Sequence, residues 1–297
     1  MTSPRSRYRP GAAPDYSHRF HAGNIGDVWK HCVLVDVLER ARAAGGAVVY
    51  VETHAGEGEY LLQSTGEWTE GIGRLWDDDT AAAGADPVAR YVALCRRLAP
   101  GADRPTSYPG SPAFARAVLG AGATLALWER DAAAYGRLAV HVGADPRTHV
   151  HRADGLAALA DAVRDAEAAA DVVVLLVDPS YAQKSDWHDV PDALIAAARG
   201  SARACILLWY PVKSLTRPNA MIARLRSAGV DGALAELVTT PLEHQRRRLN
   251  GSGVVLVRPP DGVLAALGGA AARLGARCAT EAGKWSYRMQ AWGAIRP

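Results

Sequence analysis

Short apolar runs that alternate with helical patterns are the feature that most constrains the fold of this chain. The predicted strands cover residues 48–51, 124–128, 148–152, 172–177 and 205–209, and all of them except 148–152 are rich in valine, isoleucine or leucine. Because buried parallel strands read as apolar runs, this βαβα rhythm predicts a mostly parallel sheet. Two later runs, 233–239 and 254–257, predict an antiparallel pair, so that one reversed strand finishes the sheet at its edge.

The chain is expected to form one domain behind a short arm. Residues 1–15 are rich in Pro, Arg and Ser without periodicity, which fits a flexible basic arm or a terminus without a role. Residues 16–297 would form the domain. Between about 60 and 107 the sequence contains helical stretches, Ala-rich pieces and several Trp residues but no convincing strand, which predicts a helical insertion between the first two strands of the sheet.

Composition limits the class of protein. No apolar run approaches the ~18 residues that a membrane helix needs, and the N-terminus lacks the apolar middle of a signal peptide, so we expect a cytoplasmic protein. The four cysteines form no CxxC pair and are expected to be reduced, mostly buried thiols. The net charge of +3 permits a polyanionic partner without requiring one.

Acidic residues follow four of the predicted strands. These are Glu52, Glu129, Asp154 and Asp178, and each one stands directly after an apolar run or within three residues of its end. Carboxyl ends of parallel strands share one edge of a sheet, where ligands bind. A single such acid is more often a helix cap, but four in register favour a binding site. The glycine loop that contains Gly56 lets a cofactor approach the backbone, and the acid of the next strand can accept both hydroxyls of a ribose.

Other cofactor classes fit less well. The segment from Val51 to Tyr60 is not GxGxxG, and Glu129 lies far beyond the ~20 residues of the dinucleotide fingerprint, which argues against a dehydrogenase. The sequence contains no GxxxxGK[ST] motif, so phosphoryl transfer from a P-loop is not supported. His21, His31 and His54 lack the spacing of a zinc ligand set, and we expect no metal.

The segment Asp178-Pro179-Ser180-Tyr181 suits one chemical task. The amine of an adenine is a poor nucleophile, because its lone pair is delocalised into the ring. The carboxylate of Asp178 and the carbonyl of Pro179 could each accept an amine hydrogen, while Tyr181 stacks on an extruded base. In isolation, a β-turn that merely follows a strand is an equally good interpretation.

Several motifs together resemble one known family, the bacterial ribosomal RNA large subunit methyltransferase J family. The resemblance covers about residues 16–260 and rests on these matches: Tyr16 to Asn24, Asp27, Lys30-His31, Thr53 to Gly56, Tyr108 to Pro112, Ala153 to Gly155, Asp178-Pro179 with Tyr181, Trp209 to Pro211 and Gly251 to Gly253. It implies a Rossmann-like class I methyltransferase that uses S-adenosyl-L-methionine and leaves S-adenosyl-L-homocysteine. The implied substrate is the N6 amine of an adenine in 23S rRNA.

The resemblance also assigns residues. It implies cofactor contacts at Lys30, His31, His54, Ser111, Glu129, Asp154 and Gly155, to which the glycine loop adds Gly56. Asp178 would be the catalytic acceptor, with Pro179 and Tyr181 beside it, and Tyr16 would face the RNA. Arg246 and Arg247 could track a phosphate backbone or form a solvated basic loop. Where the family usually has proline, this chain has Ser180, so the loop loses a rigid ring while both acceptors remain.

The sequence therefore predicts a monomeric rRNA adenine-N6 methyltransferase that acts on 23S rRNA, naked or in early assembly, without a membrane or a metal. Two alternatives stay open. One is a DNA adenine or protein amide methyltransferase of the same fold, because the acceptor tetrapeptide suits such substrates too. The other is an RNA-binding protein that retains the fold without catalysis, which would not bind S-adenosylmethionine.

Overall fold

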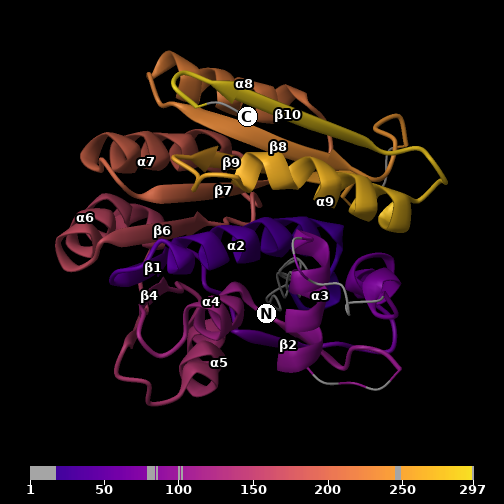
Figure 1. Ribbon diagram of the computed structural model, residues 1–297, viewed down its shortest axis with the longest axis horizontal. Helices are drawn as coiled ribbons and strands as arrows, with labels where there is room; N and C mark the ends of the chain where they lie inside the picture. The colour runs from indigo at the N-terminus through magenta and orange to yellow at the C-terminus, as the bar shows by residue number, and fades with distance from the viewer. Residues whose placement is uncertain are drawn as a thin grey trace, which may run out of the picture.

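A computed structural model describes residues 18–78, 84, 86–99, 101, 103–244 and 249–295. Within these residues the main sheet has eight strands in the order β10-β8-β9-β7-β6-β1-β4-β5 (Figure 1). Its strands are β1 (Val48–Glu52), β4 (Thr124–Trp128), β5 (Thr148–His151), β6 (Val172–Val177), β7 (Cys205–Val212), β8 (Gly232–Val238), β9 (Gly251–Val257) and β10 (Ser286–Trp292). The sheet thus reverses its order at β1, with β4 on one side and β6 on the other, which is the kind of switch point where ligands bind.

The expected fold class is confirmed: the chain has the α/β Rossmann-like methyltransferase fold. Strands β5, β4, β1, β6 and β7 are parallel. The antiparallel part is larger than the single reversed edge strand that we predict. Strand β9 runs antiparallel between β7 and β8, and a second reversed strand, β10, pairs with β8 and forms the edge.

Two apolar clusters cover the two faces of the sheet. One contains side chains of α2 (Ile25–Ala43), α4 (Ser111–Leu119), α5 (Ala132–Val142) and α9 (Val263–Cys278), and Figure 1 shows α2 and α9 crossing the sheet on the near side. The other contains α6 (Gly155–Ala169), α7 (Asp186–Gly200) and α8 (Thr216–Ser227). Alternate residues of β6 contribute to opposite clusters, as the pleat requires: Val174 joins the first cluster and Val173 the second.

The segment between β1 and β4 forms a small layer of its own beside α2. It contains a two-stranded antiparallel sheet of β2 (Glu59–Leu61) and β3 (Ser107–Pro109), the 3₁₀-helices η1 (Glu67–Glu70) and η2 (Ile72–Leu75), and α3 (Pro87–Leu98). The sequence does not predict these two strands, because each is only three residues long. Their pairing brings the two ends of the segment together, and α3 packs on α2, α4 and α9.

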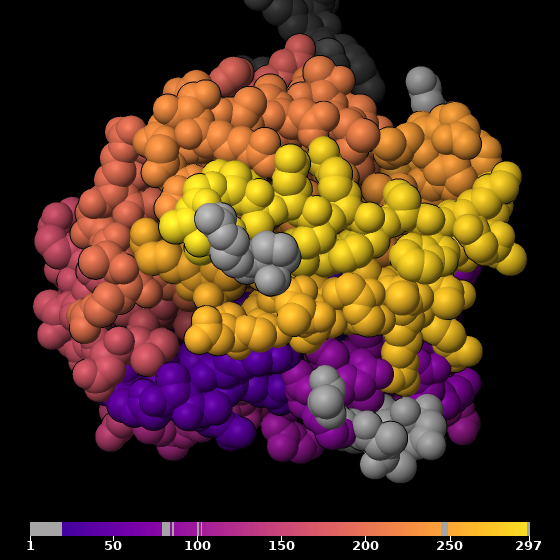
Figure 2. All heavy atoms as spheres, turned by 45° about the horizontal axis from the view of Figure 1, so that its top comes forward, coloured from indigo at the N-terminus to yellow at the C-terminus, as the bar shows by residue number. Residues whose placement is uncertain are grey.

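The C-terminal elements complete the sheet. Helix α9 packs on β8 and β10, and Figure 2 shows the gold and yellow residues of this region spread together over one face, next to the indigo residues of α2. The short helix α1 (His18–His21) precedes α2 and contacts η1. None of the described helices is long and apolar enough to cross a membrane.

Candidate functional site

The four predicted acids all lie at the carboxyl edge of the parallel strands. Glu52 ends β1, Glu129 directly follows β4, Asp154 stands three residues after β5, and Asp178 directly follows β6. These strands are adjacent in the order β6-β1-β4-β5. The acids therefore form one row, with Asp178 at the β6 end of it and the other three towards β5.

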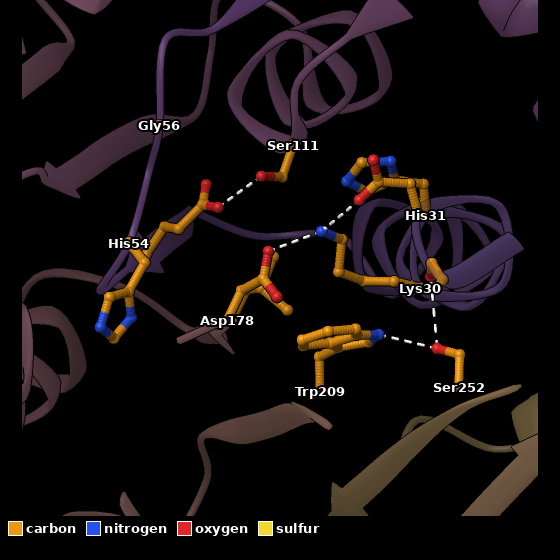
Figure 3. A network of polar contacts seen from close by, with 12 residues as sticks. Lys30, His31, His54, Gly56, Ser111, Asp178, Trp209 and Ser252 are labelled. Carbon is orange, nitrogen blue, oxygen red and sulfur yellow. Dashed lines mark hydrogen bonds and ion pairs between the residues drawn. The ribbon is translucent and has the colours of Figure 1, made fainter. Parts of the chain in front are cut away.

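Asp178 is held by a buried ion pair. The Nζ atom of Lys30 lies 2.6 Å from Oδ2 of Asp178 and 2.8 Å from Oδ1 of Asp27, and the Lys30 side chain is only 5% exposed. In Figure 3 the side chains of Lys30 and Asp178 point toward each other. Burial would lower the pKa of Lys30, but the two carboxylates more than offset this and raise it above its ordinary value. Lys30 is therefore an ammonium ion at neutral pH, and it fixes one oxygen of Asp178.

The N-terminus of α2 positions Lys30. Asn24 caps the helix, since its side-chain oxygen accepts the N–H of Asp27 at 3.1 Å. The carboxylate of Asp27 reaches back to the N–H of Gly23 at 2.9 Å. This reciprocal arrangement resembles a capping box and places Asp27 one turn before Lys30 on the same side of the helix. Asn24 and Asp27 belong to the matched motifs, but the sequence analysis did not predict that they cap α2 and position Lys30.

Tyr181, which we predict as a stacking platform, is packed against its neighbours in this structure, and its role towards a base stays a prediction. Its side chain is buried, with 9% exposure, and its ring lies against Trp187 with the centroids 4.3 Å apart. Its hydroxyl donates to the carbonyl of Trp209 at 3.1 Å, and its backbone has φ 52°, which is unusual for a residue with a side chain. Tyr181 thus anchors to β7 the segment Asp178–Tyr181 that follows β6, which we name the acceptor loop. The residue before it, Ser180, is exposed.

The half-buried ring of Trp209 lies beside the ion pair. Lys30 Nζ is 5.6 Å from its centroid, which is within the range of a cation–π contact. Its indole N–H donates to the hydroxyl of Ser252 at 2.7 Å, and that hydroxyl in turn donates to the carbonyl of Gly26 at 3.3 Å (Figure 3). Trp209 is therefore tied both to β9 and to α2.

Glu52 is fully buried at the end of β1. It accepts hydrogen bonds from the hydroxyl of Tyr50, at 2.9 Å, and from the hydroxyl of Ser111 at the start of α4. Burial raises the pKa of Glu52 to about 8, although the two hydroxyls act in the opposite direction. Ser111, which we predict at the cofactor, points at Glu52 in this structure (Figure 3).

Glu129 links the loop after β1 to the loop after β4. Its carboxylate accepts the N–H of Gly56 at 3.0 Å and the N–H of Asp131 at 2.7 Å. Partial burial raises the pKa of Glu129, and these backbone donors act against that rise. Gly56 has φ 63°, and a Cβ at this position would lie 2.0 Å from the hydroxyl of Tyr60, so only glycine fits.

Asp154 and Gly155 open α6. Asp154 is the N-cap, and its carboxylate accepts the N–H groups of Leu156 and Ala157 at 2.9 and 3.3 Å. The helix-cap interpretation thus holds for this acid, while its half-exposed second oxygen stays within 3.6 Å of Arg130. A Cβ on Gly155 would lie 2.2 Å from the carbonyl oxygen of Thr53, so glycine lets α6 approach the loop after β1 closely.

The two histidines of the predicted cofactor site differ. His31 is 2% exposed, its Nδ1 lies 2.7 Å from the hydroxyl of Tyr108, and its ring packs on Phe114 with the centroids 4.9 Å apart. His54 lies in the loop after β1, with Nδ1 2.8 Å from the hydroxyl of Thr53. Burial lowers the pKa of His54, so it is neutral at neutral pH. In Figure 3 its ring points away from Lys30 and Ser111.

A second polar cluster, which sequence reasoning missed, ties η1 to the start of α2. The buried carboxylate of Glu67 accepts from the side-chain amide of Asn24 at 2.8 Å and lies 2.9 Å from Nδ1 of His21. Since Asn24 also caps α2, the cluster connects the segment between β1 and β4 with the helix that carries Lys30. The pairing joins residues more than 40 positions apart, and no local pattern signals it.

Three predicted site residues lie outside the described part of the chain: Tyr16, Arg246 and Arg247. The arm at 1–15 lies outside it too. Within the described ranges, no three or more His, Cys, Asp and Glu side chains are grouped as a metal site would require. All four cysteines are buried and form no disulfide.

Comparisons with known proteins agree on one family. Residues 45–291 match the family model described as "Ribosomal RNA large subunit methyltransferase D, RlmJ". Proteins named "Ribosomal RNA large subunit methyltransferase J" from Escherichia coli and Haemophilus influenzae are each 32% identical over 251 residues, which is 82% of this chain and 87% of theirs. A crystal structure of a Legionella pneumophila protein has a TM-score of 0.81 at 24% identity, and the match covers 92% of this chain and 99% of that one, which shows the same fold.

Proposed function

We propose, from the premise that the chain belongs to the ribosomal RNA large subunit methyltransferase J family, that it methylates the N6 amine of one adenine in 23S rRNA. This is a family of S-adenosylmethionine-dependent methyltransferases of 23S rRNA. The observation that carries the proposal is the position of Asp178. It stands at the carboxyl end of β6, next to β1, and Lys30 fixes one of its oxygens from α2.

The residues beyond Asp178 in the row fit S-adenosylmethionine. Gly56 lets the loop after β1 adopt a positive φ, and Gly155 lets the start of α6 approach that loop closely. The half-buried carboxylate of Glu129 offers oxygens to ribose hydroxyls. Asp154 presents a half-exposed carboxylate at the next strand. The cofactor contacts proposed for Lys30, His31, His54 and Ser111 rest on the family resemblance. When bound, S-adenosylmethionine supplies a methyl group that a nucleophile can displace from sulfur.

Asp178 and Pro179 prepare the amine of the substrate. Among the described residues, no hydrogen bond reaches Oδ1 of Asp178, whereas Oδ2 is fixed by Lys30. Oδ1 and the carbonyl of Pro179 accept the two amine hydrogens, which favours a pyramidal nitrogen whose lone pair is available for attack. Methyl transfer forms the N–C bond and breaks the S–C bond, and the amine then gives up one proton, for which Asp178 is the nearest acceptor.

Lys30 and Tyr181 act through Asp178 and its loop. The ammonium of Lys30 holds the carboxylate in one orientation, and Asp27 holds the ammonium. The Tyr181 hydroxyl fixes the loop to β7. The half-buried ring of Trp209, which lies beside Lys30, is a second candidate, with Tyr181, for contact with an extruded base.

The proposed partner is 23S rRNA, naked or in early assembly, with Tyr16, Arg246 and Arg247 as its predicted contacts. The test is methyl transfer from labelled S-adenosylmethionine to unmodified 23S rRNA, to DNA and to a protein extract by the purified chain, followed by digestion to nucleosides. We expect label in N6-methyladenosine from the RNA alone. Label in DNA adenine or in a protein amide would contradict the substrate, and an absence of S-adenosylmethionine binding in calorimetry would contradict catalysis itself.

Asp178→Asn serves as the matched variant in the same assay. The amide keeps the size of the side chain but presents a donor on one side and cannot take a proton. We expect folding and S-adenosylmethionine binding to persist and turnover to fall by about 100-fold or more, in line with the loss of a positioned acid–base group. Normal turnover by the folded variant would remove the role that we propose for Asp178.

A further inference from the structure

Exposed cations that lack a partner are concentrated near the carboxyl edge of the sheet. Most Lys and Arg side chains in the described part of the chain form ion pairs, hydrogen bonds or ring contacts. Within that part, the exposed ones that form none are Arg42, Arg104, Arg152, Lys184, Lys213 and Arg217. Four of these six lie in the loops or the first helical turn that follow β5, β6 and β7. Positive charge that the protein itself leaves uncompensated attracts polyanions.

Three of these residues adjoin the acceptor loop. Lys184 follows that loop after β6, Lys213 directly follows β7, and Arg217 is in the first turn of α8. Since β6 and β7 are parallel neighbours, the segments that follow them lie at the same edge. Met221, one turn after Arg217 on the same side of α8, has its sulfur 3.8 Å from the hydroxyl of Tyr181, so this side of the helix faces the acceptor loop. We name Lys184, Lys213 and Arg217 the cation face.

Among the described residues, the cation face forms no ion pair with Asp186 or Asp189, the two acids in the first turn of the adjacent helix α7. Asp186 of α7 accepts the backbone N–H of Gln183 at 3.1 Å and makes no ion pair with Lys184 among the described residues. Further along α7 and α8 the cations are paired. Arg224 of α8 makes a bidentate contact with Asp192 of α7, with both N–O distances at 2.6 Å. Around these two helices, the unpaired cations among the described residues thus lie at the end near Asp178, where Lys184 precedes α7 and Arg217 opens α8.

The position of the cation face relative to Asp178 suggests its occupant. The row of glycines and acids that fits the cofactor lies on the β1, β4 and β5 side of Asp178, whereas the cation face lies on the β7 side. Given the proposed function, on which this inference rests, the target adenosine reaches Asp178 while its flanking phosphates remain outside. We propose that Lys184, Lys213 and Arg217 bind the phosphates that flank the target adenosine, so that the RNA strand crosses the protein on the β7 side of Asp178.

The test compares the salt dependence of RNA binding between the full chain and a variant that carries Lys184→Gln, Lys213→Gln and Arg217→Gln. The probe is unmodified 23S rRNA transcript, and binding is measured between 50 and 200 mM salt. Each phosphate contact contributes about 0.7 to 0.9 to the slope of log K against log salt, so the variant should lower the slope by roughly 2 to 3. The KM for RNA should rise, while kcat at saturating RNA stays within about twofold, because no reacting atom is touched.

Arg42→Gln is the matched control. The side chain of Arg42 is also exposed and makes no polar contact among the described residues, but it lies at the C-terminal end of α2, before β1 and hence at the opposite edge of the sheet. We expect this variant to keep the slope and the KM of the parent chain. Calorimetry with S-adenosylmethionine shows in each case whether the site remains folded.

The outcomes separate this inference from the proposed function. A parent chain that methylates 23S rRNA, together with a triple variant that keeps its slope and KM, would overturn the cation face alone. A slope that falls equally in the Arg42→Gln control would also overturn it, because the effect would then be one of net charge. If the parent chain does not methylate rRNA, the proposed function fails and the cation face fails with it.

Discussion

Replacement of Glu52 by glutamine should remove a large pH dependence from the stability of this protein. Glu52 is fully buried at the end of β1 and accepts hydrogen bonds from the hydroxyls of Tyr50 and Ser111. Glutamine has the shape of the protonated carboxyl group, and its amide can satisfy the same two hydroxyls, because a hydroxyl can donate or accept. It cannot, however, become charged.

The sign and size of the effect follow from burial. The pKa of Glu52 rises from 4.5 to about 8 in the folded protein. Folded chains therefore keep a proton that unfolded chains release, and the associated stability is present below pH 4.5 and is lost as the pH rises through 8. At about 1.4 kcal/mol per pKa unit, the difference corresponds to roughly 5 kcal/mol of unfolding free energy.

Urea denaturation at several pH values between 5 and 9, followed by tryptophan fluorescence, measures this contribution. The unfolding free energy of the parent chain should fall over this range by roughly 3 to 5 kcal/mol more than that of Glu52→Gln, since other titrating groups cancel in the comparison. At pH 9 the variant should be the more stable of the two. Parallel pH profiles would refute the reasoning, because they would mean that Glu52 is charged or well solvated in the folded protein.

Further predictions concern the ion pair and the close contact at α6. Lys30→Met should lower the unfolding free energy measured in urea by about 3 to 5 kcal/mol, because it leaves the carboxylates of Asp178 and Asp27 buried without a cation. Adding Asp27→Asn should recover part of that loss, and a Lys30→Met protein of unchanged stability would contradict the buried pair. Gly155→Ala should lower the unfolding free energy by about 1 to 3 kcal/mol, because its Cβ would lie 2.2 Å from the carbonyl oxygen of Thr53. It should also weaken S-adenosylmethionine binding in calorimetry. Gly268→Ala in α9, where a Cβ meets nothing within 4 Å, should instead stabilise the protein by roughly 0.5 to 1 kcal/mol, and equal effects of the two changes would refute the packing argument.

The parallel part of the sheet could be predicted from the sequence because most of its strands are short apolar runs that end in a polar signal. The runs at 124–128 and 172–177 coincide with β4 and β6. The C-terminal part could not be predicted in this way. Helix α9 contains the pair Gly268-Gly269, which weakens a helical pattern. Strand β10 is a half-exposed edge strand rather than an apolar run, and the alternation that places Tyr287, Met289 and Ala291 on one side is a strand signal that our sequence analysis did not use.

The candidate site was predictable in its members but not in their contacts. Position at a strand end pointed to Asp178, yet its partner Lys30 is 148 residues away in the chain, and no local pattern reports such a pair. The burial of Tyr181 was missed for a similar reason, because the partner of its hydroxyl, the carbonyl of Trp209, belongs to another strand. Asp154 shows the reverse case, since local helix-cap preference correctly describes its hydrogen bonds.

The central claim is that this chain methylates one adenine of 23S rRNA and that Asp178 is the acceptor. Mass-spectrometric mapping of N6-methyladenine in the large-subunit rRNA of a deletion strain, complemented with the parent gene or with the Asp178→Asn gene, tests it most directly. The account predicts that one modified adenine disappears on deletion and that only the parent gene restores it. An unchanged map in the deletion strain, or full restoration by the Asp178→Asn gene, would contradict it.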